Sequence, residues 1–374
     1  MTSALSRACR FGGRNYAFPA PKVIMRVQRD RGAMGALPFE RDRLRVAREL
    51  VGLSQNQLAS RVGLSPAAIS QFESGAARPT EESLLQLAGV LQVPIGFFGQ
   101  PITETHEGFF RSLRRSSVAD RRRARSIAHV AHDLARAATD SGQFPESAVP
   151  RILPTGLNAD RREIEEIAHQ VRRLWNVPDG PIDDVVSLLE SHGVVVIRLP
   201  LGSADVDAFS LPFDDHPVVV LGSDKGDRAR SRFDCAHELA HLVMHGEIIW
   251  GIKEVEEQAH QFAAAFLMPA EEIYDELPAT VDWQKLFALK QHWQVSLAAL
   301  LMRAKRLGRM SDATYLTAVK AASARGWRRQ EPVPLGPPEQ PTLLLKFLEE
   351  TDLPILSLLP ESIVESIVRA SSVA

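Results

Sequence analysis

Apolar residues recur every three or four positions from Phe39 to about residue 98, which is the spacing of amphipathic helices. Serine caps and glycines divide this stretch into three short helices, because serine favours helix starts and glycine favours helix ends. The dividing residues are Gly52, Ser54, Gly63, Ser65 and Gly75. Short helices joined by tight glycine-containing turns predict an all-α helix-turn-helix domain over residues 37–99.

Arginines and a proline-rich stretch follow over residues 100–156. Arg111, Arg114 and Arg115 come first, and the run 121–125 precedes an apolar helical pattern. Two interpretations stay open for these arginines: a second phosphate-contacting surface, or the charged flank of a connecting helix. Residues 142–156 are rich in proline and small side chains, which predicts a linker.

The apolar pattern changes to strand-like runs within residues 157–310. Amphipathic helices over 161–175 and from residue 185 lead into β-branched runs at 193–197, 206–210 and 217–221. A further helix is expected to run as one element from near Asp227 through Gly246 and to pack beneath the sheet. Helices that flank a small sheet predict an α+β domain.

That helix carries His237, Glu238 and His241 in a His-Glu-x-x-His motif. Residues four apart share a helix face, so both imidazoles can reach one ion with Glu238 beside it. A catalytic zinc site takes three protein ligands, and the next predicted helix supplies Glu256 as the third, with Glu257 as the alternative. The sequence therefore predicts Zn²⁺ held by His237, His241 and Glu256.

Amide hydrolysis is the chemistry that this site would support. Zinc lowers the pKa of a water ligand towards about 7 and polarises a peptide carbonyl, so Glu238 needs only to move one proton from water to the leaving amine. A donor for the developing oxyanion is not fixed by the pattern, and His245, His260 and Tyr274 are candidates. The alternative for His245 is to cap or orient the site. Cys235 is expected to be a small core residue rather than a ligand.

The first domain resembles Cro/XRE-type repressors over residues 40–98. The resemblance lies in Leu53-Ser-Gln55-x-x-Leu58-Ala59, Ile69-Ser70-x-x-Glu73-x-Gly75 and Pro79. It implies that the third helix enters the major groove of an operator, and that Gln55 contacts a phosphate while Gln71 reads a base. The expected DNA-binding residues are Gln55, Ser65, Ala67, Ala68, Ser70 and Gln71. Ala67 and Ala68 can touch thymine methyl groups but cannot make bidentate hydrogen bonds, so modest specificity is expected.

Six further arginines in or beside this domain are candidate phosphate contacts, with ordinary solvated surface positions as the alternative. They are Arg41, Arg43, Arg45, Arg48, Arg61 and Arg78. A homodimer on two half-sites is expected from the same resemblance.

The second domain resembles the ImmA/IrrE family of zinc peptidases, on His237-Glu-Leu-Ala-His241, His245 and the run from Glu256 to Pro269. The resemblance implies a zincin-like metallopeptidase fold and cleavage of a repressor-type protein, or of the chain itself, in response to a signal. An intact Glu238 favours this reading. The alternative is a transcription regulator whose zinc domain is a sensor or structural module with little proteolysis.

Composition places these domains in a protein of ordinary globular type. The chain has 374 residues, 45% of them hydrophobic, and a net charge of −2, so attraction to DNA must be local. No apolar run is long enough to cross a membrane. Residues 1–36 are expected to be a disordered basic tail, and residues 311–374 a partly disordered helical extension with a last helix near 343–350. The two cysteines, Cys9 and Cys235, are not expected to pair, which fits a cytoplasmic location.

Overall fold

The computed structural model describes residues 9–11, 14–16, 37–105, 117–142, 144–201, 208–223, 226–245, 252–350 and 354–372. Residues 1–37 and 38–374 form separate units. Within the first unit, strands β1 (Cys9–Phe11) and β2 (Arg14–Tyr16) pair antiparallel. The rest of the expected basic tail lies outside the described residues, as do Arg111, Arg114 and Arg115.

The helix-turn-helix domain has the three predicted helices followed by a fourth. Their bounds are α1 (Arg41–Leu50), α2 (Gln55–Val62), α3 (Pro66–Ser74) and α4 (Glu81–Leu91), with a 3₁₀ turn η1 (Ile95–Gly99). Ser54 and Ser65 cap α2 and α3 through their side chains. Gly63 ends α2 with a φ of 67°, a left-handed conformation that glycine adopts without the steric cost of a Cβ. The serine and glycine pattern therefore located the helix boundaries correctly.

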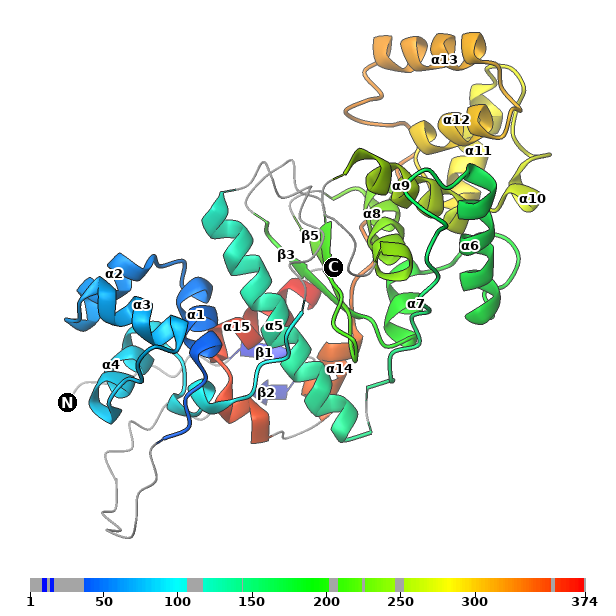
Figure 1. Cartoon of the computed structure of the whole chain (residues 1–374). Coiled ribbons are helices and arrows are strands. Elements are labelled where there is room, and N and C mark those ends of the chain that lie inside the picture. Colours follow the sequence, from blue (N-terminus) through cyan, green and yellow to red (C-terminus); the bar gives the residue numbers. More distant parts are fainter. Residues whose placement is uncertain are drawn as a thin grey trace. The chain divides into compact units, whose positions relative to one another are not determined.

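Helix α5 (Val118–Asp140) is the long element that follows. It contacts α1 on one side and strands β3 and β5 on another (Figure 1). Its buried residues, which include Ile127, Val130 and Leu134, belong to one hydrophobic cluster that also contains the core of α1–α4. The connecting helix is thus part of the core of the chain rather than a solvated spacer.

A three-stranded mixed sheet lies at the centre of the second domain. Strands β3 (Val195–Leu199), β4 (Ala208–Leu211) and β5 (Val218–Gly222) have the order β3-β5-β4, with β3 parallel and β4 antiparallel to β5. Alternate residues face opposite sides of the sheet. Ile197 and Val220 join the α5 cluster, whereas Val196 and Val219 join a second cluster with the helix that carries the His-Glu-x-x-His motif (the metal helix, Arg228–Ala240). The sheet therefore separates two cores.

Helices cover the face of the sheet that carries Val196 and Val219, and the helical part of the domain continues beyond the sheet (Figure 1). In chain order they are α6 (Arg161–Leu174), α7 (Val185–Ser191), α8 (Arg228–Ala240), α9 (Lys253–Leu267), α10 (Ala270–Ile273), α11 (Trp283–Trp293), α12 (Leu297–Arg306) and α13 (Asp312–Ala324). The α+β arrangement agrees with the sequence prediction. None of the helices in the described ranges combines the length and the apolar character that a bilayer crossing requires.

Two segments without regular secondary structure are fixed by hydrogen bonds. In the predicted linker, the backbone N–H groups of Ala148 and Ile152 donate to the carbonyls of His192 and Val243. In the proline-rich stretch after α13, Glu339 forms a buried ion pair with Arg232 of α8. Its carboxylate also accepts hydrogen bonds from N–H groups at the start of α7. Both segments are bound to the second domain along their length.

The C-terminal segment ends in helices that return to the first cluster. They are α14 (Leu343–Glu350), at the predicted position, the 3₁₀ turn η4 (Pro354–Leu358) and α15 (Glu361–Ser372). Helix α15 contacts β3 and α5. The helix predicted near 343–350 is therefore present, whereas α15, which was not predicted, adds Ile363, Val364 and Ile367 to the first cluster.

Candidate metal centre and DNA-binding face

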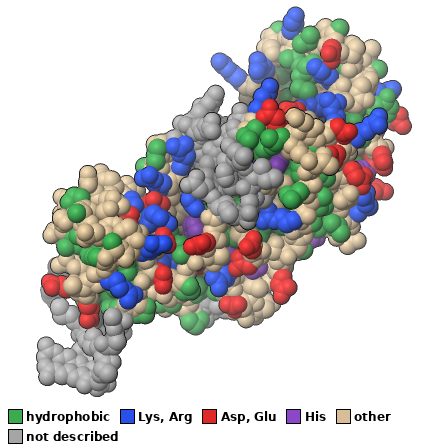
Figure 2. Space-filling view, in the orientation of Figure 1, with side chains coloured by type: hydrophobic (Ala, Val, Ile, Leu, Met, Phe, Trp, Pro, Cys, Tyr) green, Lys and Arg blue, Asp and Glu red, His purple; other side chains and the backbone are tan. Residues whose placement is uncertain are grey.

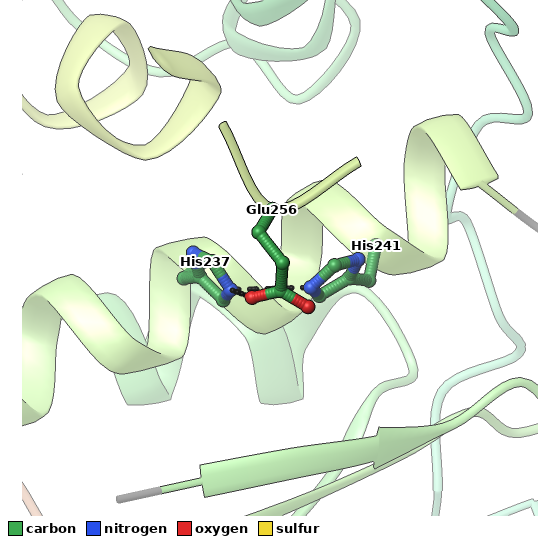
Figure 3. Close-up of side chains that lie close together, drawn as sticks. All are labelled: His237, His241 and Glu256. Atoms are coloured by element: carbon green, nitrogen blue, oxygen red, sulfur yellow. Dashed lines mark hydrogen bonds and ion pairs between the residues drawn. The ribbon is translucent and has the colours of Figure 1, made fainter. Parts of the chain in front are cut away.

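Three predicted ligands converge between α8 and α9. One donor atom from each of His237, His241 and Glu256 lies within 4.8 Å of the others. His237 and His241 extend from the metal helix, and Glu256 reaches them from the first turn of α9 (Figure 3). The structure thus brings together the set that the motif spacing predicted.

The separations of the donor atoms suit a zinc ion. The two histidine Nε2 atoms are 3.1 Å apart, and His237 Nε2 is 3.6 Å from Glu256 Oε2. Ligands about 2.0–2.1 Å from a tetrahedral zinc are about 3.3 Å from one another. Two imidazoles and one carboxylate are also the donor set of many catalytic zinc sites. The residues present therefore fit the metal.

A series of buried hydrogen bonds leads from His241 away from the other two predicted ligands. His241 Nδ1 lies 3.0 Å from His245 Nδ1, and His245 Nε2 lies 3.1 Å from Gln258 Oε1. The Gln258 amide nitrogen donates to the carbonyls of Gly156 and Leu157 at 2.8 and 3.1 Å. His245 is therefore a neighbour of the ligand His241, consistent with the orienting role that was one of its expected options.

Burial keeps these imidazoles neutral at ordinary pH. It lowers the pKa of His241 well below its usual value, with His237 and His245 adding to the effect. It also lowers the pKa of His245 to about 4, although the hydrogen bond with Gln258 acts in the opposite direction. Zinc binds the neutral imidazole, so desolvation here favours the ligating form.

Glu238 is buried next to the three predicted ligands, and a residue of strand β4 holds its carboxylate. Ser210 of β4 donates its hydroxyl to Glu238 Oε2 at 2.7 Å. Burial raises the pKa of Glu238 well above its usual value; the Ser210 hydrogen bond lowers it, and the charge of Glu256 raises it further. Ser210 was not among the predicted site residues, although its position in an alternating strand was a signal that it faces the metal helix.

The other candidates near the site differ in their surroundings. His260 Nδ1 bonds to the carbonyl of Glu256, and its ring lies 4.5 Å from that of His237. Tyr274 is on the surface, where Arg309 lies over its ring. Glu257, the alternative ligand, pairs with Arg306 at 2.5 Å. Cys235 is fully buried in the second cluster, as its interpretation as a core residue predicted.

The metal helix differs from the prediction at its end. A single helix was expected through Gly246, but α8 ends at Ala240 and His241–His245 forms a π-helical turn. Gly246 lies outside the described residues. A π turn adds a residue to the helical repeat and re-aims the side chains that follow, and such turns are frequent at functional sites.

The predicted DNA-reading residues form an exposed face on α3. Ser65, Ala67, Ser70 and Gln71 are exposed, and Ala68 is half-buried. The hydroxyl of Ser65 accepts the N–H of Ala68 as a helix cap. The side chain of Gln55 donates to Glu73 at 2.8 Å. Its expected phosphate contact would therefore use the other groups that it exposes at the start of α2.

Two of the candidate arginines are structural instead. Arg43 is buried and bonds to both carboxylate oxygens of Asp133 on α5, at 2.5 and 2.9 Å. Arg48 is buried and makes the same bidentate pair with Glu73, at 2.6 and 2.9 Å. A phosphate contact by Arg43 or Arg48 is therefore the wrong interpretation, because their guanidinium groups are used inside the domain.

The arginine run of α5 divides between two roles. Arg123 donates to the carbonyl of Leu50 at 3.1 Å, and Arg125 to that of Thr105 at 3.4 Å. Arg122 is exposed and lines a polar cavity of about 570 Å³ beside α2 and α3. Other residues of that cavity include Arg45, Glu49, Gln55, Asn56, Ser70 and Ser74. On the face shown in Figure 2, basic and acidic side chains are interspersed, which agrees with local rather than global attraction to DNA.

Comparisons with known proteins match both regions. Residues 44–98 match the family model described as helix-turn-helix, and residues 189–305 match the peptidase family model described as IrrE N-terminal-like domain. One similar curated protein is the cryptic phage CTXphi transcriptional repressor RstR of Vibrio cholerae, 27% identical over 95 residues, which is 25% of this chain and 85% of the repressor. The chain therefore joins an XRE-type helix-turn-helix domain of the kind found in transcription regulators to an IrrE/ImmA-like peptidase-family domain.

Proposed function

We propose that this protein is a DNA-binding transcription regulator whose second domain is a zinc-dependent endopeptidase. The observation that carries the proposal is the convergence of His237, His241 and Glu256 beside the buried Glu238. Three ligands leave a position of the ion open, as catalysis requires and a closed structural site does not.

Glu238 is the general base and acid of the proposed reaction. A bound zinc ion would polarise the peptide carbonyl and acidify water. Glu238 takes a proton from water at its carboxylate and returns it to the leaving amine, and the Ser210 hydroxyl holds one carboxylate oxygen during this cycle. The high proton affinity that burial gives to Glu238 suits a group that must accept a proton from water.

The DNA partner is a double-stranded operator, and the exposed face of α3 is the proposed reader. The match to the helix-turn-helix model and the likeness to a phage repressor support this assignment. We propose that the protein is a homodimer, because repressors of this type read two half-sites one helical turn apart, about 34–36 Å. We also place it in the cytoplasm.

The protein substrate is a repressor-type protein or a copy of this chain, and cleavage awaits a signal. Constitutive self-cleavage would destroy the regulator as fast as it was made, so the resting protein is expected to be intact.

The test compares wild-type and Glu238→Gln proteins loaded with zinc. Each is incubated with candidate XRE-type repressors, with and without operator DNA, and fragments are identified by mass. Glu257→Gln is the matched control, because it makes the same chemical change on an exposed side chain that pairs with Arg306. Fragments are expected from the wild type and the control but not from Glu238→Gln, which still binds zinc. If no condition gives a fragment that depends on Glu238, the endopeptidase proposal is wrong.

A second candidate function is a transcription regulator whose metal domain is a sensor or structural module. The shared hydrophobic cluster favours it, because α5 contacts both α1 and the central sheet and gives the two domains a common core. In that case removal of zinc would change operator affinity, and the Glu238→Gln substitution would leave both zinc content and operator affinity unchanged.

A further inference from the structure

The hydrogen bonds behind His241 have a direction that the neighbouring groups determine. Backbone carbonyls can only accept, so the Gln258 amide must present its nitrogen to Gly156 and Leu157. The reverse orientation would put three oxygen atoms against one another at these separations. The Gln258 oxygen therefore faces His245 and needs a donor there.

The orientation of Gln258 in turn determines which nitrogen carries the proton in His245 and in His241. His245 must donate from Nε2 to Gln258, and a neutral ring has one N–H, so its Nδ1 is an acceptor. The nitrogen next to it is Nδ1 of His241, at 3.0 Å, which must then carry the proton. That leaves the lone pair of His241 on Nε2, the atom 3.1 Å from His237 Nε2 in the ligand cluster.

We infer that Gln258 and His245 are positioning residues that fix the tautomer and ring orientation of His241, so that its Nε2 is set to bind metal before the metal arrives. The inference rests on the proposed metal site. His241, His245 and Gln258 are 1%, 1% and 4% exposed, so water has little access to replace these bonds. These hydrogen bonds begin at the carbonyls of Gly156, the last residue of the predicted linker, and of Leu157, so this segment contributes to the proposed metal centre.

Partners of this kind typically change metal affinity by 10- to 100-fold when they are removed. Gln258→Leu removes the acceptor for His245, so nothing then fixes which nitrogen of His245 and of His241 carries the proton. Gln261→Leu is the matched control, since Gln261 is on the same helix but bonds to Glu257 at 3.3 Å.

The first measurement is made on full-length, metal-free protein labelled with ¹⁵N-histidine. Long-range ¹H–¹⁵N correlation spectra report which nitrogen of each imidazole carries the proton, and the His241 signals are identified by their loss in His241→Asn. The wild type and Gln261→Leu are expected to hold the proton of His241 on Nδ1. Gln258→Leu is expected to show a mixture of tautomers.

The second measurement is the zinc affinity of the same proteins, by competition with a chelator. Gln258→Leu is expected to bind about 10- to 100-fold more weakly, whereas Gln261→Leu stays close to wild type. A proton on Nε2 of His241 in the metal-free wild type overturns the inference. So does a Gln258→Leu protein with unchanged tautomer and affinity. Neither measurement uses a peptide substrate, so a lack of proteolysis would contradict the proposed function and leave this inference standing.

Discussion

Replacing Glu190 by glutamine is expected to remove a pH dependence of stability that this residue creates. Glu190 is near the end of α7, and its carboxylate accepts the backbone N–H groups of Thr342 at 3.1 Å and Leu343 at 3.0 Å, where α14 begins. Burial raises the pKa of Glu190 to about 7, although these two hydrogen bonds act to lower it. Glutamine can accept the same N–H groups but does not titrate.

The free energy of unfolding decreases with pH because the folded protein binds a proton more tightly at Glu190 than the unfolded chain does. The folded protein holds a proton on Glu190 up to about pH 7, whereas the unfolded chain loses it near 4.5. The free energy of unfolding therefore receives its full contribution from this group below pH 4.5, and the contribution is lost as pH rises through 7. At about 1.4 kcal/mol per pKa unit, the loss approaches about 3 kcal/mol above pH 8. Glu190→Gln should match the wild type near pH 4.5 and be the more stable protein at pH 8.5.

The assay is denaturant unfolding at several pH values from 4.5 to 8.5, with hydrogen exchange of the peptide around residues 340–350 as a local measure. Glu166→Gln is the control: Glu166 pairs with Arg173 on the surface, so its replacement should change stability by no more than about 0.5 kcal/mol. If wild type and Glu190→Gln lose stability in parallel across this range, the assignment to Glu190 is refuted.

Three further results are expected from the metal and DNA sites. His237→Ala and Glu256→Ala should lose zinc after mild chelation, measured by metal analysis, whereas Glu257→Ala should keep it; full occupancy in the first two would contradict the ligand set. Arg122→Ala should lower the slope of log affinity against log salt by about 1 if this side chain contacts a phosphate, and an unchanged slope would remove it from the DNA face. Gln71→Ala should relax preference at one base position in a binding-site selection, and an unchanged preference would show that Gln71 reads no base.

The sequence was most informative where a local rule decides the structure. Ser54 and Gly63 mark the start and end of α2, because capping and left-handed backbone are properties of single residues. The spacing of His237 and His241 on one helix likewise predicted that they meet, and the apolar run at 217–221 became β5 (Val218–Gly222). These predictions needed no knowledge of what lies across the core.

It was least informative where the partner is distant in the chain. The burial of Arg43 depends on Asp133, ninety residues away, so its charge alone suggested a surface role. Gln258 and Ser210 are common polar residues whose roles appear only when the loop at 156–157 and helix α8 are placed beside them. The proline-rich stretch before α14 had the composition of a flexible segment, but Glu339 fixes it through a buried ion pair with Arg232.

The shared core also bears on the proposed self-cleavage. A flexible tether would hold the two domains at about millimolar effective concentration and favour cleavage within one molecule. Here the core of α1–α4 continues through α5 to one face of the sheet, whereas the metal helix α8 packs in the cluster on the other face. The core of the helix-turn-helix domain and the metal helix therefore belong to clusters on opposite sides of β3-β5-β4. If the second domain is the proposed peptidase, this arrangement favours a separate protein, or a second copy of the chain, over its own DNA-binding helices as the substrate.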